Sequence, residues 1–408
     1  MTRLVFFLES YTAGGADRVA RLLVENLHAD VIYLLVNRSI DTRIMFATPL
    51  PKHVQVRRYN LVTPMDLGLY ANRFRSNALV FGLLKAGDYL ARYPLLIWSF
   101  VYFSVFIRRF RATHFFAHNG GYPGGLYCGT ASMAAALILR VRCFLAVHSL
   151  PRAYTRLQWP LDWIWDRTLD QCCTMICVSK RSAALLRSIR AIKQHPICIY
   201  NGIESATLKS YRLTGELRLL HVGYFDFNKN QSMAIECLAQ LVRKGVTSVK
   251  LTFVGDVMVP EAREEVGILV KKWGLESYVE FAGFREDLTS YYEENDLLLC
   301  TSKVESFPLV VLEAMRVGMP VISTNVGGVV EQIQEGKTGN LVDVDDVARM
   351  SDRILFFYEN RDQIKMMGEA AYHLFQEKFT LKNMVKKYHA ALGLRVESLP
   401  SADAMARD

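Results

Sequence analysis

The chain has 408 residues, of which 51% are hydrophobic and 22% are charged, and this composition excludes a disordered chain. Its length predicts a folded protein of two or three domains. The net charge of +9 is uneven, because residues 1–200 carry 25 Lys and Arg against 10 Asp and Glu, a net of +15, whereas the remainder carries 24 against 30, a net of −6. The basic half indicates an anionic partner, either nucleic acid, anionic lipid or a phosphorylated ligand.

The eight cysteines form no Cys-x-x-Cys pair and lie mostly in apolar surroundings. This pattern favours small buried hydrophobes over metal ligands or disulfides, and it is typical of a reducing compartment. The apolar run near the N-terminus is too short for a signal peptide and predicts a first strand over Leu4–Leu8. We therefore expect a cytoplasmic protein.

In the first half of the chain, short apolar runs alternate with longer helical stretches. A glycine loop separates the first strand from a helix over Ala16–Leu27. Further strands are predicted at Val31–Val36, Thr113–Ala117, Arg142–Val147, Met175–Val178 and Ile197–Tyr200.

Between these strands, Pro94–Ile107 forms 14 residues without a charge, flanked by arginines on both sides. A bilayer-spanning helix needs about 20 residues, so we expect no span here. The favoured interpretation is a core helix that leads into the strand at Thr113. The alternative is a helix that lies on a membrane face with its arginines among the lipid headgroups.

The second half alternates more regularly. Strands are predicted at Leu217–Val222, Lys250–Val254, Tyr278–Ala282, Asp296–Thr301, Pro320–Thr324 and Gly339–Val342, and helices at Gln231–Lys244, Pro260–Trp273, Asp287–Glu294, Phe307–Val317, Gly328–Gln334, Val347–Tyr358 and Leu381–Leu392. Such alternation predicts βαβ units and a parallel sheet covered on both faces.

The predicted fold class is therefore α/β, with two Rossmann-like domains that face each other across a ligand cleft. The expected domains are 1–205, 206–378, a C-terminal helix over 379–393 that packs back on the N-terminal domain, and a tail over 394–408. The turn Asn201-Gly202 is the candidate hinge.

Two loops at predicted strand ends are suited to phosphate. Gly14-Gly15 lies between the first strand and the first helix, where backbone N–H groups can approach an anion, although a plain tight turn is an equal alternative. Lys229 follows the strand at Leu217 and can neutralise a diphosphate, although a solvated loop lysine is as common.

Two glutamates, Glu305 and Glu313, flank and enter the apolar run that ends at Met315. We expect Ser306 to cap the helix and Pro308 to lie in its first turn, so that Glu305 stands at the strand end. Eight residues correspond to about 80° around a helix, so both carboxylates can face one cleft. Two carboxylates suit a ligand with several hydroxyl groups.

Together these motifs resemble family 4 of the GT-B glycosyltransferases, the retaining nucleotide-sugar transferases with a Glu-x7-Glu motif. The resemblance extends over most of the chain: Gly14-Gly15 with Arg18, Val178-Ser179-Lys180, Tyr200-Asn201-Gly202-Ile203, Phe281-Ala282-Gly283, Glu305 to Glu313, and Gly327-Gly328 with Glu331.

The resemblance implies roles for individual residues. Glu313 would bind the ribose, Glu305 the donor sugar, and Lys229 the diphosphate, while Gly14 and Gly15 would bring N–H groups to the phosphates from the other domain. The implied catalytic residues are His148, Lys229 and Glu305. The implied donor site comprises Gly14, Gly15, Gly223, Tyr224, Lys229, Phe284, Arg285, Glu305, Ser306, Phe307, Pro308, Leu309 and Glu313.

On the acceptor side we expect Asn119, Gly120 and Tyr122, from a glycine-rich loop after the strand at Thr113; a simple flexible connection is an equal alternative. Asp343-Val344-Asp345 has the form of a metal-binding Asp-x-Asp motif, but it directly precedes a helix and capping explains it. We expect no metal and no cofactor, with a UDP- or GDP-linked sugar as the donor substrate.

One residue departs from the family pattern, because Tyr224 stands where the family usually has a diphosphate-binding arginine. The prediction is a retaining, metal-independent sugar transferase in bacterial-type surface polysaccharide or lipopolysaccharide synthesis, and its glycan acceptor is expected to be lipid-linked. The basic half predicts contact with the inner face of an anionic plasma membrane. The alternative function is a non-catalytic GT-B scaffold; nucleic-acid binding is not expected, since no recognised motif supports it.

Overall fold

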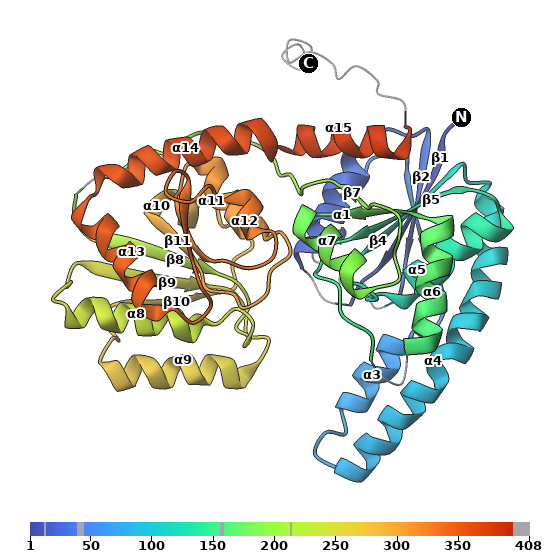
Figure 1. Ribbon diagram of the computed structural model, residues 1–408, viewed down its shortest axis with the longest axis horizontal. Coiled ribbons are helices and arrows are strands. Elements are labelled where there is room, and N and C mark those ends of the chain that lie inside the picture. The colour runs from blue at the N-terminus through green and yellow to red at the C-terminus, as the bar shows by residue number, and fades with distance from the viewer. Residues whose placement is uncertain (12–13, 39–44, 156–158, 213, 395–408) are drawn as a thin grey trace. The chain divides into compact units, whose positions relative to one another are not determined.

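The computed structural model describes residues 1–11, 14–38, 45–155, 159–212 and 214–394. They form two compact units (Figure 1). Unit 1 comprises Met1–Val178, Ala183–Ile199 and the chain from Met384, and unit 2 comprises Ser179–Ser182 and Tyr200–Asn383. The chain thus passes from unit 1 to unit 2 a few residues before the predicted boundary, and most of the predicted tail lies outside the described residues. The predicted α/β class is confirmed.

Unit 1 is built on a seven-stranded parallel sheet with the order β3-β2-β1-β4-β5-β6-β7. The strands are β1 (Arg3–Glu9), β2 (Val31–Val36), β3 (Val54–Arg58), β4 (His114–Asn119), β5 (Arg142–Val147), β6 (Thr174–Cys177) and β7 (Ile197–Cys198). In register, Glu9 pairs with Asn119 and Asn119 with Val147, so the carboxyl ends of β1, β4 and β5 form one edge of the sheet.

Helices pack on this sheet because their apolar faces match its two buried faces. They are α1 (Gly15–Asn26), α3 (Pro64–Asn72), α4 (Ala78–Phe106), α5 (Leu126–Met133), α6 (Trp159–Cys172) and α7 (Lys180–Ile189), and α15 (Leu381–Leu392) adds its C-terminal part. From α15, the Tyr388 ring packs on Phe116 with centroids 5.6 Å apart.

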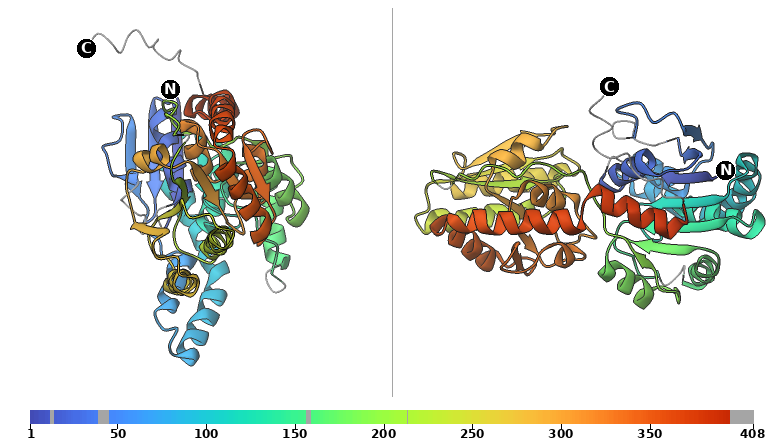
Figure 2. Two further views of the ribbon diagram at one scale, coloured as in Figure 1. Left: turned by 90° about the vertical axis from the view of Figure 1, so that its left-hand side faces the viewer. Right: turned by 90° about the horizontal axis from the view of Figure 1, so that it is seen from above.

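Helix α4 differs from the expectation for Pro94–Ile107. It has 29 residues and contains Pro94 in its interior, because a long helix tolerates the loss of one backbone hydrogen bond. Only one face of its second half is buried, through Leu96, Ser99, Phe103 and Phe106. The core interpretation is therefore correct for that face and wrong for the rest. In two views, α3 and the first half of α4 project beyond the sheet of unit 1 (Figures 1 and 2).

The length argument against a membrane span is also corrected. Within the described residues, Ala78–Phe110 is long and apolar enough to cross a bilayer by length and composition, and 28% of its most apolar window is buried. The same helix is attached to unit 1, since Ser99 donates a hydrogen bond to Thr130 at 2.9 Å and the Phe103 ring lies 5.2 Å from Phe7.

Unit 2 has a six-stranded parallel sheet with the order β10-β9-β8-β11-β12-β13. Its strands are β8 (Leu217–Val222), β9 (Val249–Val254), β10 (Val279–Gly283), β11 (Leu297–Cys300), β12 (Val321–Thr324) and β13 (Gly339–Val342). Its helices are α8 (Gln231–Arg243), α9 (Pro260–Trp273), α10 (Thr289–Glu294), α11 (Leu309–Val317), α12 (Val329–Gln332), α13 (Val347–Glu359) and α14 (Asp362–Lys378). The predicted alternation is confirmed, while α14 was not predicted.

Each unit has its own hydrophobic core. The core of unit 1 gathers around Phe7, Phe103 and Phe115, and that of unit 2 around Phe253 and Phe357. All eight cysteines lie in described segments and are free thiols, most of them buried, as the sequence predicted.

Candidate functional site

In unit 2, the loop after β8 places Lys229 at the carboxyl edge of the sheet. Gly223 begins this loop at a φ of +156°, and a Cβ there would lie 3.3 Å from Cδ of Lys229. The lysine backbone is fixed by its N–H, which donates to Asp226 at 2.7 Å, and by its carbonyl, which accepts from Thr301 at 2.8 Å. The glycine therefore leaves the space that the lysine side chain fills.

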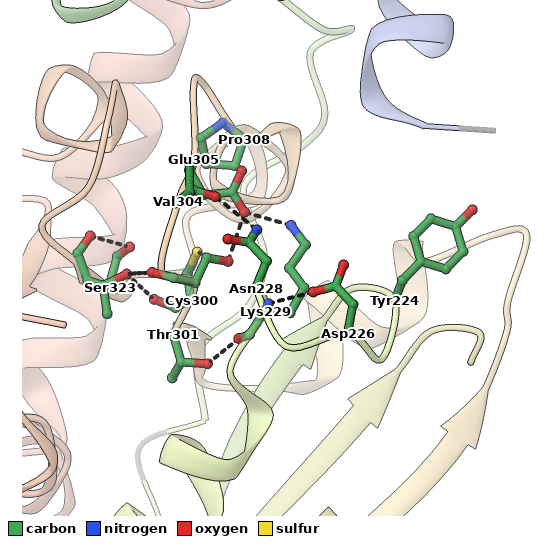
Figure 3. Close-up of polar contacts among 12 residues, drawn as sticks. Tyr224, Asp226, Asn228, Lys229, Cys300, Thr301, Val304, Glu305, Pro308 and Ser323 are labelled. Carbon is green, nitrogen blue, oxygen red and sulfur yellow. Dashed lines mark hydrogen bonds and ion pairs between the residues drawn. The ribbon is translucent and has the colours of Figure 1, made fainter. Parts of the chain in front are cut away.

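Lys229 and Glu305 form an ion pair (Figure 3). The Nζ atom of Lys229 lies 2.6 Å from Oε1 of Glu305, which also accepts a hydrogen bond from Ser302 at 2.8 Å. Burial alone would lower the pKa of the Lys229 ammonium, but the Glu305 carboxylate raises it above its ordinary value. The lysine is thus a fixed positive charge beside a carboxylate.

The loops around this pair carry three other predicted residues. The ring of Tyr224 points away from the Lys229 side chain (Figure 3). Phe284 is 50% exposed. Arg285 follows it on the surface, where its Nε atom donates to the Tyr291 hydroxyl at 3.1 Å. The structure therefore brings Lys229 and Glu305 together and leaves Tyr224 directed elsewhere.

The run from Glu305 to Pro308 is a loop, not the start of a helix. Helix α11 begins at Leu309 with Pro308 as its N-cap, so the prediction that Ser306 caps the helix is wrong, and the angle of 80° does not apply to Glu305. Phe307 is buried, where its ring stacks on Tyr200 at 5.1 Å. Phe307, Pro308 and Leu309 thus anchor the loop by packing.

The loop is also held by a glycine from the next motif. The N–H of Gly328 donates to the carbonyl of Ser306 at 2.8 Å, and a Cβ on Gly328 would lie 2.1 Å from that oxygen. Only glycine permits this approach. The paired glycines of the sequence therefore position the loop that carries Glu305.

Glu313 lies inside unit 2, on the buried face of α11. It is 3% exposed, and its Oε2 atom accepts a hydrogen bond from the Tyr292 hydroxyl at 2.6 Å. Tyr292 comes from α10 and is fully buried. A buried carboxylate needs such partners, so the otherwise apolar helix carries a polar position supported by a neighbouring element.

In unit 1, a pocket of about 590 Å³ opens at the carboxyl ends of β1 and β4. The predicted residues Gly14, Gly15, Asn119, Gly120 and Tyr122 all line it, while Thr12 and Ala13 of the same loop lie outside the described residues. A second cavity of about 440 Å³ runs along α3 and α4. The two cavities share Glu9, Met65, Leu69, Arg92, Gly124 and Leu126.

Two of the predicted acceptor-side residues form hydrogen bonds within the protein through their side chains. The Asn119 side-chain oxygen accepts from the N–H groups of Gly121 and Gly125, at 3.3 and 2.9 Å. The Tyr122 hydroxyl donates to Asp166 at 2.8 Å. Both residues therefore shape the glycine-rich loop.

His148 follows β5 and stacks on His118, with ring centroids 4.0 Å apart. His118 lines the pocket, whereas His148 is not among the lining residues. Burial lowers the pKa of His148 well below its ordinary value, and His118 lowers it further, so the ring is neutral near pH 7. Neither ring nitrogen of His148 has a hydrogen-bond partner among the described residues.

The sequence analysis missed Glu9, the last residue of β1. It lines both cavities of unit 1, and burial raises its pKa to about 7. The available signal was a carboxylate at the end of an otherwise apolar strand, five residues before the glycine pair.

The Asp-x-Asp sequence has a structural role. Asp346, the next residue, caps α13 by accepting from the N–H of Arg349, and Asp345 accepts a hydrogen bond from Asn230 at 2.9 Å. Within the described segments, three or more His, Cys, Asp or Glu side chains nowhere gather as a metal site would require.

Similarity to solved structures extends over nearly the whole chain. A structure of Anabaena Alr3699/HepE in complex with UDP-glucose aligns with a TM-score of 0.71 at 19% identity, covering 96% of this chain and 100% of that one. The lipopolysaccharide outer core galactosyltransferase WaaB aligns with a TM-score of 0.65 at 15% identity, over 96% and 99% of the two chains. The fold is therefore that of the GT-B glycosyltransferases.

Sequence similarity is concentrated in unit 2. Residues 207–374 match the model of the family "Glycosyl transferases group 1". N-acetyl-alpha-D-glucosaminyl L-malate synthase of Bacillus anthracis is 34% identical over 181 residues, which are 44% of this chain and 46% of the relative. The chain thus matches about half the length of such curated relatives. Unit 2 carries a glycosyl transferases group 1 domain.

Proposed function

We propose that the protein is a retaining, metal-independent glycosyltransferase that moves a sugar from a nucleotide-diphosphate sugar to a glycan acceptor. The observation that carries the proposal is the Lys229–Glu305 pair, at the carboxyl edge of a parallel sheet within a glycosyl transferases group 1 domain. Parallel sheets of this type bind ligands at that edge.

In this proposal four side chains of the site have separate roles. Lys229 compensates the charge that develops on the leaving diphosphate, which is the largest electrostatic demand of the reaction. Glu305 exchanges part of its contact with Lys229 for hydroxyl groups of the donor sugar, and Glu313 accepts hydrogen bonds from the ribose. His148, whose two buried ring nitrogens have no hydrogen-bond partner in the described part of the chain, offers a neutral donor and acceptor to a sugar hydroxyl.

The donor is tested by thermal shift with UDP-, GDP- and other nucleotide sugars, followed by an assay of donor hydrolysis and sugar transfer. A ligand at 100 times its Kd stabilises the folded state by about 2.7 kcal/mol. We expect a UDP- or GDP-linked sugar to raise Tm. HepE has been solved in complex with UDP and UDP-glucose, which supports testing UDP-linked donors first.

The ribose role of Glu313 gives a first prediction. Glu313→Ala should weaken binding of the nucleotide about tenfold or more, because a charge-assisted hydrogen bond contributes about 1.5–3 kcal/mol. The measurement is calorimetric titration with UDP or GDP. The control is Glu294→Ala, an exposed glutamate at the end of α10. Equal nucleotide affinity in Glu313→Ala and wild type would remove Glu313 from the ribose site.

We further propose a lipid-linked acceptor in surface polysaccharide synthesis, bound at the inner face of an anionic plasma membrane. Residues 73–111 carry seven Lys and Arg against one acidic residue. In the same segment, α4 exposes a row of large apolar side chains: Leu79, Leu83, Leu90, Ile97, Trp98, Val101 and Val105. Apolar insertion with flanking cations is the pattern of helices that bind anionic bilayers.

The membrane proposal gives a second prediction. The protein should cosediment with phosphatidylglycerol vesicles at low salt, and Leu83→Glu with Leu90→Glu should reduce the bound fraction several-fold. The matched control is Ile268→Glu, since Ile268 is 58% exposed on α9 of unit 2. Equal vesicle binding by both variants and wild type would contradict the role of α4.

The non-catalytic scaffold stays the rival function, because Tyr224 supplies no cation next to Lys229. It predicts that the wild type neither hydrolyses nor transfers any donor that it binds. Turnover of a bound donor would exclude it.

A further inference from the structure

Glu9 stands at the floor of the unit 1 pocket, where both cavities meet. It is the last residue of β1, next to Asn119 in the neighbouring strand. Only 6% of the residue is exposed, and the cavity along α3 and α4 and the pocket at the glycine loops both include it in their walls.

The surrounding chain is built to hold this carboxylate. Its Oε1 atom accepts from the Tyr11 hydroxyl at 2.7 Å, and its Oε2 atom accepts from the N–H of Tyr127, in the first turn of α5, at 2.9 Å. A Cβ at position 125 would lie 3.1 Å from Oε2, so glycine there leaves room for Glu9. A helix N-terminus and a glycine thus fix the carboxylate in one orientation.

Three other polar side chains that line the pocket are hydrogen-bonded within the protein. Asn119 holds the glycine-rich loop, and Tyr122 is bonded to Asp166. The Nε2 atom of His118 is hydrogen-bonded to the carbonyl of Ala16 at 2.8 Å. The Glu9 carboxylate accepts from the Tyr11 hydroxyl and from the backbone N–H groups of Tyr127 and Cys128, so one of its four acceptor sites is left for a ligand.

We propose that Glu9 is an acceptor-binding residue, whose carboxylate accepts a hydrogen bond from a hydroxyl group of a carbohydrate acceptor in the unit 1 pocket. The inference rests on the proposed function and adds a residue, Glu9, that contacts the acceptor. The pocket has the chemistry for a sugar, since tyrosines, glycine backbone and two arginines line it together with the carboxylate.

The ionisation of Glu9 follows from its surroundings. Burial raises its pKa to about 7 and the nearby Asp66 raises it further, whereas hydrogen bonds from Tyr11 and from the backbone of Tyr127 and Cys128 lower it. Tyr11, Tyr59, Tyr127 and Cys128 also face Glu9, and burial raises the pKa of each, so they stay neutral. Arg92 and Arg152 are cations in the pocket wall, and Arg92 is paired with Asp162. Acceptor binding should therefore strengthen as pH rises through about 7.

The test uses Glu9→Gln in the full chain. Glutamine has the same shape, and its amide can accept from the Tyr127 N–H while donating to the Tyr11 oxygen, whose own hydrogen can turn to Thr63. The control is Asp30→Asn, an exposed carboxylate just before β2, at the opposite edge of the sheet.

The probes are octyl β-glucoside, octyl β-galactoside and octyl N-acetyl-β-glucosaminide, below their micelle concentrations, with binding measured by saturation-transfer NMR from pH 5.5 to 8.5. We expect at least one glycoside to bind the wild type, with affinity rising about tenfold through pH 7. In Glu9→Gln the pH step should be absent and the affinity at pH 8 about tenfold lower, while Asp30→Asn follows the wild type.

Two results would overturn the inference: no glycoside binding to the wild type, or an unchanged pH step in Glu9→Gln. UDP binding is measured in parallel by thermal shift, so that failure of the Glu9 inference can be distinguished from failure of the proposed function. A wild type that binds glycosides through Glu9 but binds no nucleotide would reject the transferase and keep the carbohydrate site.

Discussion

At the scale of single residues, Glu9 is a position where function and stability conflict. An unfolded glutamate has a pKa of 4.5, whereas the folded value is about 7. Between these values the folded state keeps a proton that the unfolded state releases, so stability falls as pH rises through this window, by about 3 kcal/mol in total. Below pH 4.5 this loss is absent, and above pH 7 it is complete.

Glu9→Gln should therefore raise the Tm of the protein at pH 8 by several degrees and have little effect at pH 5. Thermal unfolding at the two pH values measures the difference. An equal or lower Tm for the variant at pH 8 would mean that the ionised carboxylate does not destabilise the folded state.

We expect Lys229 to bind the diphosphate of the nucleotide. Lys229→Gln removes the cation and should weaken UDP binding about tenfold or more, while the affinity for uridine, which has no phosphate, changes by less than about threefold. Calorimetric titration with both ligands checks this. A parallel loss for uridine would indicate a distorted loop instead of a lost charge.

At the scale of elements, the unit 2 strands and the helices other than α14 were predictable because their periodicity is regular and their ends carry turn residues. Helix α4 was not, since Pro94 resembles a helix start and the preceding residues are only weakly patterned. The unpredicted first half is fixed by its cap and by a partner far away in the sequence, because Asn77 accepts from the N–H of Val80 at 3.2 Å and Arg92 is paired with Asp162 of α6 at 3.1 Å.

Replacing a side chain by alanine should have different effects on stability at the two faces of α4. Phe103→Ala removes a fully buried ring and should lower the free energy of unfolding by about 3–5 kcal/mol. Val101→Ala, at a residue that is 50% exposed, should change it by less than about 1 kcal/mol. Urea unfolding of both variants tests whether the second half of α4 is core on one face only; similar losses would contradict that assignment.

At the scale of the molecule, the sequence predicted two parallel sheets and the loops that carry Lys229 and Glu305. It could not predict which side chains use their polar atoms within the protein. Asn119 and Tyr122 line the pocket as expected, yet their hydrogen bonds go to Gly125 and Asp166. Hydrogen-bond partners that are distant in the sequence or belong to the backbone cannot be predicted from a sequence pattern. Glu9 was missed for the same reason, because its cavity is formed by α3, α4 and the loop before α5.

Each unit has its own sheet and its own hydrophobic core, so the two should unfold as separate cooperative transitions. A nucleotide bound at Lys229 and Glu313 should then raise only the transition of unit 2, by mass action. Glu9→Gln at pH 8 should raise only that of unit 1. Scanning calorimetry of wild type and variant, each with and without UDP, assigns the transitions by these two independent perturbations. A single transition that both perturbations move would contradict this prediction, because the two units would then unfold as one cooperative unit.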